Sequence, residues 1–143
     1  MSDRIDSAAA AEPVGPYPHA RKVGNLLYLS GVGPRMRGSR DIPGSRLDAD
    51  GKLIDYDIEA EMVSCFENIR QILEAAGSRW ENIVDVMVFL TDMKRDWVAY
   101  NRVYARHFPP GPDQPARTTC EVAALPTGGN SPIHFEIKVI ATA

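Results

Sequence analysis

In IHFEIKVIAT (133–142), apolar and polar residues alternate as they do in a β-strand with one buried face. The polar face includes Glu136. A carboxylate on such a face is usually solvated, but a partly buried one could hold a water molecule and remove its proton. The apolar face, expected in the core, consists of Ile133, Phe135, Ile137 and Val139, and the polar face adds His134 and Lys138.

The preceding run, PARTTCEVAALP (115–126), predicts a second strand. Arg117 begins its polar face, and we expect Cys120 on the opposite, core-facing side. One interpretation of Arg117 is a surface ion pair with Glu121. The other is recognition of a substrate carboxylate, because a planar guanidinium can donate two parallel hydrogen bonds to it. With Glu136 expected on the neighbouring strand, the two residues would form a small hydrolytic site.

The rest of the chain predicts helices over 58–76 and 95–107, where apolar side chains recur at helical spacing. The β-branched run IVDVMVFL (83–90) predicts another strand, and residues 20–32 predict two short strands around a tight turn. This order of elements indicates an α+β domain with a mixed sheet and two helices on one face. The other face needs cover, which an identical subunit could supply.

Composition and charge narrow the class of protein. With 143 residues, 44% hydrophobic and 24% charged, the chain suits one domain, expected over 13–143 after a loose leader over 1–12. A net charge of -3 and a pI of about 5.6 provide no basic surface for nucleic acid. No apolar run has membrane-spanning length. Cys65 and Cys120 suit free thiols in a reducing cytoplasm.

Two further features could carry chemistry. The polar stretch over 33–57 is long for a loop in so small a domain, and such loops are usually functional or mobile. His134 and Glu136 could share a metal ion with His19, but their spacing matches no strong metal-binding motif, so no metal is expected. The polar stretch carries four arginines, which are Arg35, Arg37, Arg40 and Arg46.

Six segments in this order and spacing resemble a known family: GPY (15–17), GNLLYLSG (24–31), ENIRQILEAAG (67–77), YNRVY (100–104), PARTTCEV (115–122) and FEIKVIA (135–141). On these segments the chain resembles the Rid (YjgF-like) family of reactive-intermediate deaminases, which act on enamines and imines. The resemblance runs from about Gly15 to Thr142, which is nearly the whole chain.

The resemblance implies a chorismate-mutase-like α+β domain that assembles as a homotrimer with clefts between subunits. Such proteins hydrolyse 2-imino acids, formed from their enamine tautomers, to 2-keto acids and ammonia without a cofactor. Arg117 matches the arginine that grips the substrate carboxylate, and Glu136 matches the acid that activates water. Thr119 stands where some members have a cysteine. The other positions that line the family cleft match Tyr17, Ser30, Gly31 and Asn101.

The finer resemblance is to 2-aminomuconate deaminases of aromatic-compound catabolism, because the segment after Pro34 is longer than in broad-specificity members. Arg35, Arg37 and Arg40 could bind a second, distal carboxylate, or they could be solvated on a mobile loop. Two alternatives stay open. One is a broad-specificity deaminase of 2-iminopropanoate and 2-aminoacrylate, and the other is a trimer that binds ligands in regulation without turnover.

Overall fold

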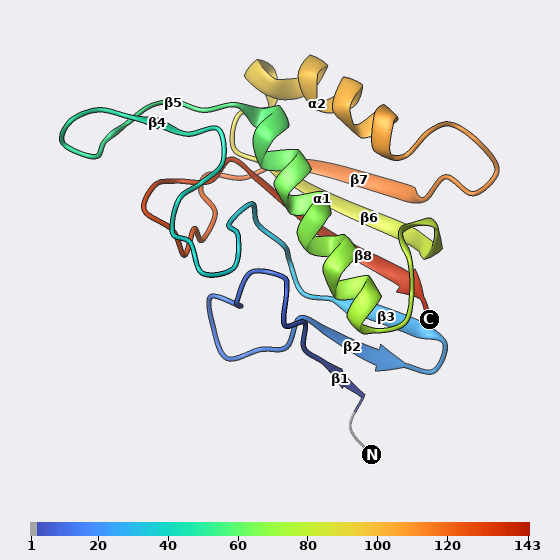
Figure 1. The fold of residues 1–143 in the computed structure, drawn as a ribbon. Helices are drawn as coiled ribbons and strands as arrows, with labels where there is room; N and C mark the ends of the chain where they lie inside the picture. The colour runs from blue at the N-terminus through green and yellow to red at the C-terminus, as the bar shows by residue number, and fades with distance from the viewer. Residues whose placement is uncertain (1–2) are drawn as a thin grey trace.

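One six-stranded sheet carries both helices on the same face (Figure 1). The computed structural model describes residues 3–143. In chain order the elements are β1 (Arg4–Ile5), β2 (Ala20–Val23), β3 (Leu26–Leu29), β4 (Arg46–Leu47), β5 (Leu53–Asp55), α1 (Ile58–Ala75), the short 3-10 helix η1 (Trp80–Asn82), β6 (Ile83–Leu90), α2 (Met93–His107), β7 (Ala116–Glu121) and β8 (Phe135–Thr142).

The strand order of the sheet is β1-β2-β3-β8-β6-β7. β6 and β7 run parallel and are joined through α2, and the other neighbours in this sheet are antiparallel. The predicted α+β class, with a mixed sheet and two helices on one face, is therefore confirmed. β2 and β3 form the predicted hairpin, in which Gly24 has a φ of 59°, a left-handed conformation that glycine adopts without steric cost.

The core lies between α1 and the middle of the sheet. Phe135, Ile137 and Val139 of β8 are at most 1% exposed, which confirms the predicted apolar face of this strand. Phe66 of α1 packs edge-on against Phe135, with 6.1 Å between the ring centroids. Because successive side chains of a strand point to opposite faces, Glu136 must point away from the helices.

Side-chain caps begin both helices. The carboxylate of Asp57 accepts the backbone N–H of Glu59 (2.9 Å) at the start of α1, and Asp92 accepts that of Arg95 (3.0 Å) at the start of α2. α1 is followed by Gly77 at a φ of 75°. In the part of the chain that the structure describes, no helix is long and apolar enough to cross a membrane.

The N-terminal segment packs on the domain, although its composition suggests a loose leader over 1–12. Residues 1–2 lie outside the described residues. Beyond them, Ser7 and Ala10 are 5% and 1% exposed. The backbone N–H of Ala11 donates to the Asn68 side chain of α1 (3.0 Å), a contact between distant segments that composition cannot reveal.

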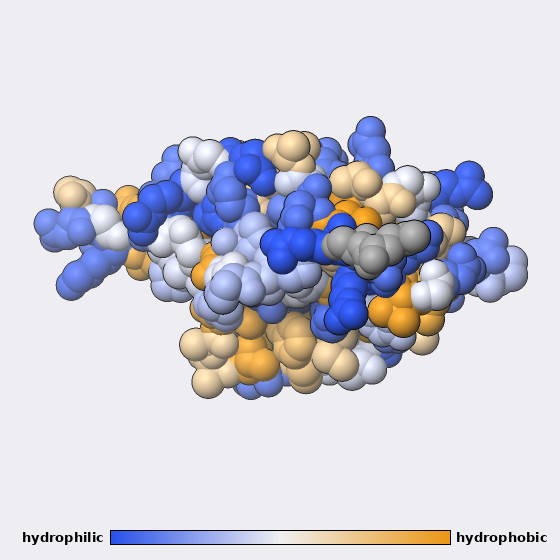
Figure 2. Space-filling view, turned by 90° about the horizontal axis from the view of Figure 1, so that it is seen from below, coloured by the Kyte–Doolittle hydropathy of each residue, from blue (hydrophilic) through white to orange (hydrophobic). Residues whose placement is uncertain are grey.

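The polar stretch over 33–57 contains the small hairpin of β4 and β5, which extends away from the sheet in Figure 1. No helix covers the second face of the sheet among residues 3–143. Tyr28 and Met87 lie on that face, 39% and 38% exposed. Seen from below, apolar residues gather along the lower margin of the molecule (Figure 2).

Candidate functional site

A cavity of about 150 Å³ opens beside the end of β3. It brings together five residues selected from the sequence: Tyr17, Ser30, Gly31, Arg35 and Glu136. The N-terminal segment, the loop after β3 and α1 supply other parts of its wall. Five side chains from these parts that bear on its chemistry are Glu12, His19, Arg35, Asn68 and Ile72.

Glu136 approaches the backbone at Gly31 because that residue has no side chain. A Cβ atom on Gly31 would lie 2.5 Å from Oε2 of Glu136, closer than real Cβ contacts allow. The local backbone explains the approach. β3 ends at Leu29, and pairing with β8 resumes only at the isolated bridge between Val32 and Ile137. The intervening residues bulge out of the sheet and form part of the cavity wall.

Ser30 is held in place at this wall. Its backbone N–H donates to the carbonyl of His19 (3.0 Å), and its hydroxyl donates to the carbonyl of Pro18 (2.7 Å). These two bonds fix the start of the bulge against the preceding segment. Ser30 therefore shapes the cavity beside Glu136.

Burial raises the pKa of Glu136 above its ordinary value of 4.5. The cause is that an enclosed site solvates the charged form poorly. A carboxyl group whose pKa lies nearer to neutrality can both accept and return a proton near pH 7. The electrostatics at Glu136 therefore suit general acid–base chemistry.

Arg117 lies in a second cluster, formed by β7 and α2. Its Nη1 donates to Oδ1 of Asn101 (2.9 Å). Its guanidinium carbon lies 4.7 Å from the ring centroid of Tyr104 and 5.1 Å from that of Tyr100. The Tyr100 hydroxyl in turn shares a 2.6 Å hydrogen bond with Thr119. Three sequence-selected residues, Arg117, Asn101 and Thr119, therefore meet here.

Tyr100 and Tyr104 are the members of this cluster that the sequence analysis missed. An aromatic stripe on a helix is usually core, and both residues are indeed buried, at 0% and 5% exposure. They also present their rings to a cation, which attracts it and restricts its position. The sequence feature that could have identified them is their i, i+4 spacing on a helix next to a strand that carries an arginine.

The structure does not bring Arg117 and Glu136 together within one chain. Arg117 is in register with buried Val86, whereas Glu136 is in register with Phe89, three positions further along β6. An odd separation along a strand places side chains on opposite faces. β6 lies between β7 and β8, so strand spacing puts the two Cα atoms about 14 Å apart. The expectation that the two residues lie on neighbouring strands is wrong, because β6 separates β7 from β8.

Two other expectations for β7 are also wrong. Cys120 is in register with Phe89 and so points to the open face, while Arg117 faces the helices. On the edge strand β7, polar side chains rather than apolar ones face the helices, because they contact the polar atoms and ring faces of α2. Arg117 and Glu121 do not form the competing ion pair: Arg117 donates to Asn101, and Glu121 accepts the backbone N–H of Met93 (2.8 Å).

The three arginines proposed for a distal carboxylate separate in the structure. Arg35 lies on the cavity wall, where its Nη1 donates to Glu12 (2.9 Å). Arg37 instead binds the backbone of the N-terminal segment, with Nε donating to the carbonyl of Ala10 (2.8 Å). Arg40 is exposed and does not line the cavity. Arg35 is therefore the candidate that remains for a ligand in the cavity.

The histidines considered for a metal ion have other partners. His134 Nδ1 lies 2.7 Å from the buried carboxylate of Glu61. His19 accepts the backbone N–H of Ser7 (2.9 Å) at Nδ1, and its Nε2 lies 2.7 Å from the carbonyl of Ala11. Residues 3–143 contain no group of three or more histidine, cysteine or acidic side chains placed to hold a metal ion.

Comparisons with known proteins show which family the chain belongs to. The chain matches the Endoribonuclease L-PSP family over residues 7–143. It is 36% identical to a RutC family protein of Saccharolobus solfataricus, covering 99% of this chain and 98% of that one. It is 31% identical to the chloroplastic Reactive Intermediate Deaminase A of Arabidopsis thaliana, over 96% of this chain and 64% of the relative. The crystal structure of E. coli TdcF with bound serine superposes with a TM-score of 0.78 at 26% identity, covering 98% of both chains.

The fold and the two clusters define an α+β protein with a positioned guanidinium at Arg117 and a partly buried carboxyl group at Glu136. The family match over nearly the whole chain narrows this description to one family. The chain belongs to the Endoribonuclease L-PSP family, in which the Rid (YjgF-like) deaminases are grouped.

We expect Gly31→Ala to displace the Glu136 carboxylate, because the added Cβ would collide with Oε2. Exposure to water should then lower the pKa of Glu136 towards 4.5. The shift can be followed by NMR titration of the side-chain carboxyl carbons. Gly33→Ala is the matched control, since its Cβ would meet only Ile133, at 3.4 Å. An unchanged Glu136 titration in Gly31→Ala would contradict the close approach.

Glu136 should also make stability depend on pH. Its folded-state pKa is raised, so the stabilisation from its protonated form is complete below about 4.5 and is lost as the pH rises through the folded pKa. As the pH rises from about 4.5 through the folded pKa, the free energy of unfolding of the wild type should therefore fall relative to that of Glu136→Gln. Urea unfolding at constant protein concentration across pH 4 to 8 measures the difference. A difference that stays constant with pH would show that Glu136 titrates normally.

Proposed function

We propose that this chain hydrolyses 2-imino acids, formed from 2-enamino acids, to 2-keto acids and ammonia. The observation that carries the proposal is a pair of complementary groups: a positioned guanidinium at Arg117 and a partly buried carboxyl of raised pKa at Glu136. The similarity to Reactive Intermediate Deaminase A of Arabidopsis thaliana supports the same activity. The serine bound by E. coli TdcF has a carboxylate beside a nitrogen-bearing carbon, as the proposed substrate does.

A second copy of the chain would complete the site. The Arg117 cluster lies on edge strand β7, and the open face of the sheet exposes apolar Tyr28 and Met87. Packing this face against another subunit would bury apolar surface and could bring the two clusters together. In a cyclic homotrimer each of three sites would combine Arg117, Asn101 and Thr119 of one subunit with Tyr17, Ser30, Gly31 and Glu136 of its neighbour.

The reaction then follows from the two groups. Arg117 binds the carboxylate next to C2 and so holds this carbon beside Glu136 of the neighbouring subunit. Glu136 accepts a proton from a water molecule as the water oxygen adds to C2 of the imine and the nitrogen is protonated. In the resulting carbinolamine the C–N bond breaks, ammonia leaves, and the hydroxyl proton is lost as the C=O bond of the keto acid forms. The carboxyl group of Glu136 relays these protons, and no covalent intermediate with the protein is required.

The finer proposal concerns the substrate and its setting. Arg35 is a cation in the same cavity as Glu136, which supports a dicarboxylic substrate such as 2-aminomuconate in aromatic-compound catabolism. Its pairing with Glu12 supports the alternative, a broad-specificity deaminase of monocarboxylic imines such as 2-iminopropanoate. Free thiols at Cys65 and Cys120 support a cytoplasmic location. A regulatory trimer that binds 2-keto acids without turnover is the non-catalytic alternative.

Replacing Arg117 with Ala should lower kcat/KM for 2-iminobutanoate by on the order of 100-fold or more, because the carboxylate loses a two-point charged contact. Ammonia release from an imine generated in the assay measures the rate. Arg102→Ala is the control, since Arg102 lies on the exposed surface of α2 and contacts only Glu59, at 3.9 Å, among the ion pairs of residues 3–143. Parental activity in Arg117→Ala would end the proposed mechanism.

Mixed assemblies test whether the site is shared. Arg117→Ala and Glu136→Gln subunits should each be nearly inactive alone. After co-refolding in equal amounts, roughly a quarter of the sites in random cyclic trimers should pair an intact Arg117 with an intact Glu136. Activity should recover to about that fraction of the parent value. A mixture no more active than its components would show that the two residues do not act across a subunit interface.

A further inference from the structure

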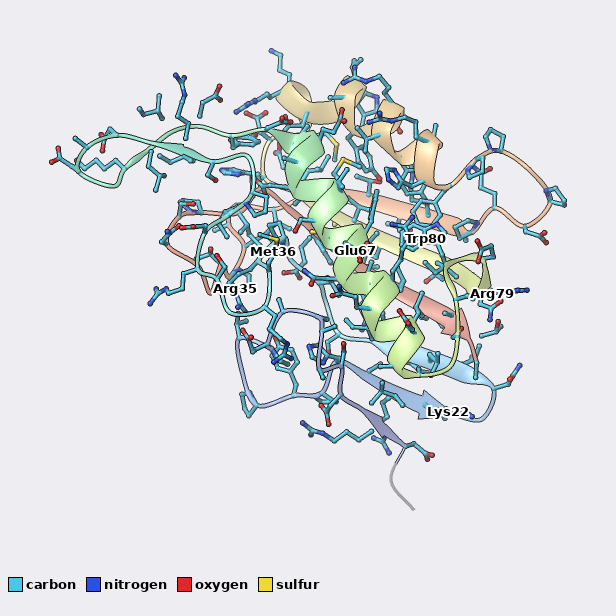
Figure 3. All side chains as sticks on the ribbon, viewed as in Figure 1. Lys22, Arg35, Met36, Glu67, Arg79 and Trp80 are labelled. Atoms are coloured by element: carbon cyan, nitrogen blue, oxygen red, sulfur yellow. The ribbon has the colours of Figure 1, made fainter. Side chains whose placement is uncertain are left out.

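Arg35 and Glu12 form an ion pair on the wall of the cavity that also contains Glu136. The Arg35 side chain is only 11% exposed. Its Nη1 donates to the Glu12 carboxylate at 2.9 Å, and its Nη2 donates to the Glu12 backbone carbonyl. Its Nε is buried and finds no hydrogen-bond partner among residues 3–143. Figure 3 places Arg35 on the loop after β3, beside the returning N-terminal segment.

Several contacts hold Glu12 at this cation. The backbone N–H of Gly38 donates to its Oε1 (3.0 Å), and Nη1 of Arg37 lies 3.5 Å from the same atom. The hydrogen bond from Arg35 lowers the pKa of Glu12 below its ordinary value. Glu12 is therefore a fixed anion at neutral pH, and it belongs to the protein's own cavity wall.

A largely buried guanidinium requires an anion, because an unpaired charge is costly to remove from water. Glu12 supplies that anion. A ligand whose carbon chain ends in a methyl group would leave the ion pair intact and would contact apolar wall residues such as Val32 and Ile72. A ligand that ends in a carboxylate would have to replace Glu12 on Arg35 or lie beside a like charge.

We propose that Glu12 determines specificity by competing with the distal carboxylate of a ligand for Arg35. Glu12 thereby lowers the preference of this site for dicarboxylic over monocarboxylic 2-keto and 2-imino acids. The inference rests on the proposed function in one respect: the ligand's carbon chain extends from Glu136 into this cavity. Arg35 favours a ligand with a negative charge at its far end, and Glu12 determines how large that preference is.

The test compares two ligands of equal chain length that differ at the far end, 2-oxoglutarate and 2-oxopentanoate. Glu12→Gln preserves the shape of the side chain and one oxygen acceptor but removes the negative charge. Calorimetric titration at fixed ionic strength should show 2-oxoglutarate binding on the order of tenfold tighter to Glu12→Gln than to the wild type. The affinity for 2-oxopentanoate should change by less than about twofold.

Three controls sharpen the comparison. The double variant Glu12→Gln, Arg35→Gln should lose the gain for 2-oxoglutarate, because the cation is gone. Glu67→Gln removes one exposed negative charge from α1 (Figure 3) and should leave both affinities unchanged. Unfolding midpoints and oligomeric state of all variants establish that the N-terminal segment stays in place.

The possible results separate this proposal from the proposed function. Equal changes for both ligands, or an unchanged affinity for 2-oxoglutarate, would overturn the role of Glu12 while imine hydrolysis by the wild type stands. If the wild type neither binds a 2-keto acid nor releases ammonia from an imine, the proposed function fails, and this inference fails with it.

Discussion

Successive side chains of a β-strand point to opposite faces of the sheet, and the rest of this structure depends on that alternation in β8. Phe135, Ile137 and Val139 use one face to build the core against α1. Glu136 is thereby forced to the other face, next to the bulge at Gly31. The same parity directs Arg117 of β7 towards α2. The core and the placement of Arg117 and Glu136 on opposite faces of the sheet thus have one cause.

The guanidinium of Arg117 and the carboxyl group of Glu136 each have a defined setting within the fold. Asn101 and the rings of Tyr100 and Tyr104 restrict the guanidinium of Arg117, so little side-chain freedom remains to be lost when a carboxylate binds. The enclosed position of Glu136 raises its pKa, which a solvated carboxylate could not achieve. The free energy of folding positions these groups, and under our proposal assembly only has to bring the two clusters together.

Under our proposal for Glu12, the N-terminal segment connects the fold to the choice of ligand. It is held by His19, Asn68, Arg35 and Arg37, which also border the cavity or the loop beside it. A segment held in this way can change the charge of a binding site without altering its reactive groups. Related chains of one fold could therefore differ in substrate through residues equivalent to Glu12, while Arg117 and Glu136 keep the same roles.

Local residue patterns were enough to predict both helices, the alternation of β8 and the class of fold, and they led us to propose Arg117 and Glu136 as the reactive pair. These features depend on residue type and short spacing, which a sequence displays directly. Folding was needed to establish which face of β7 meets the helices, because alternation defines two faces without saying which is covered. The contacts of Gly31 with Glu136 and of Glu12 with Arg35 join segments distant in the chain, so strand register and loop packing had to create them.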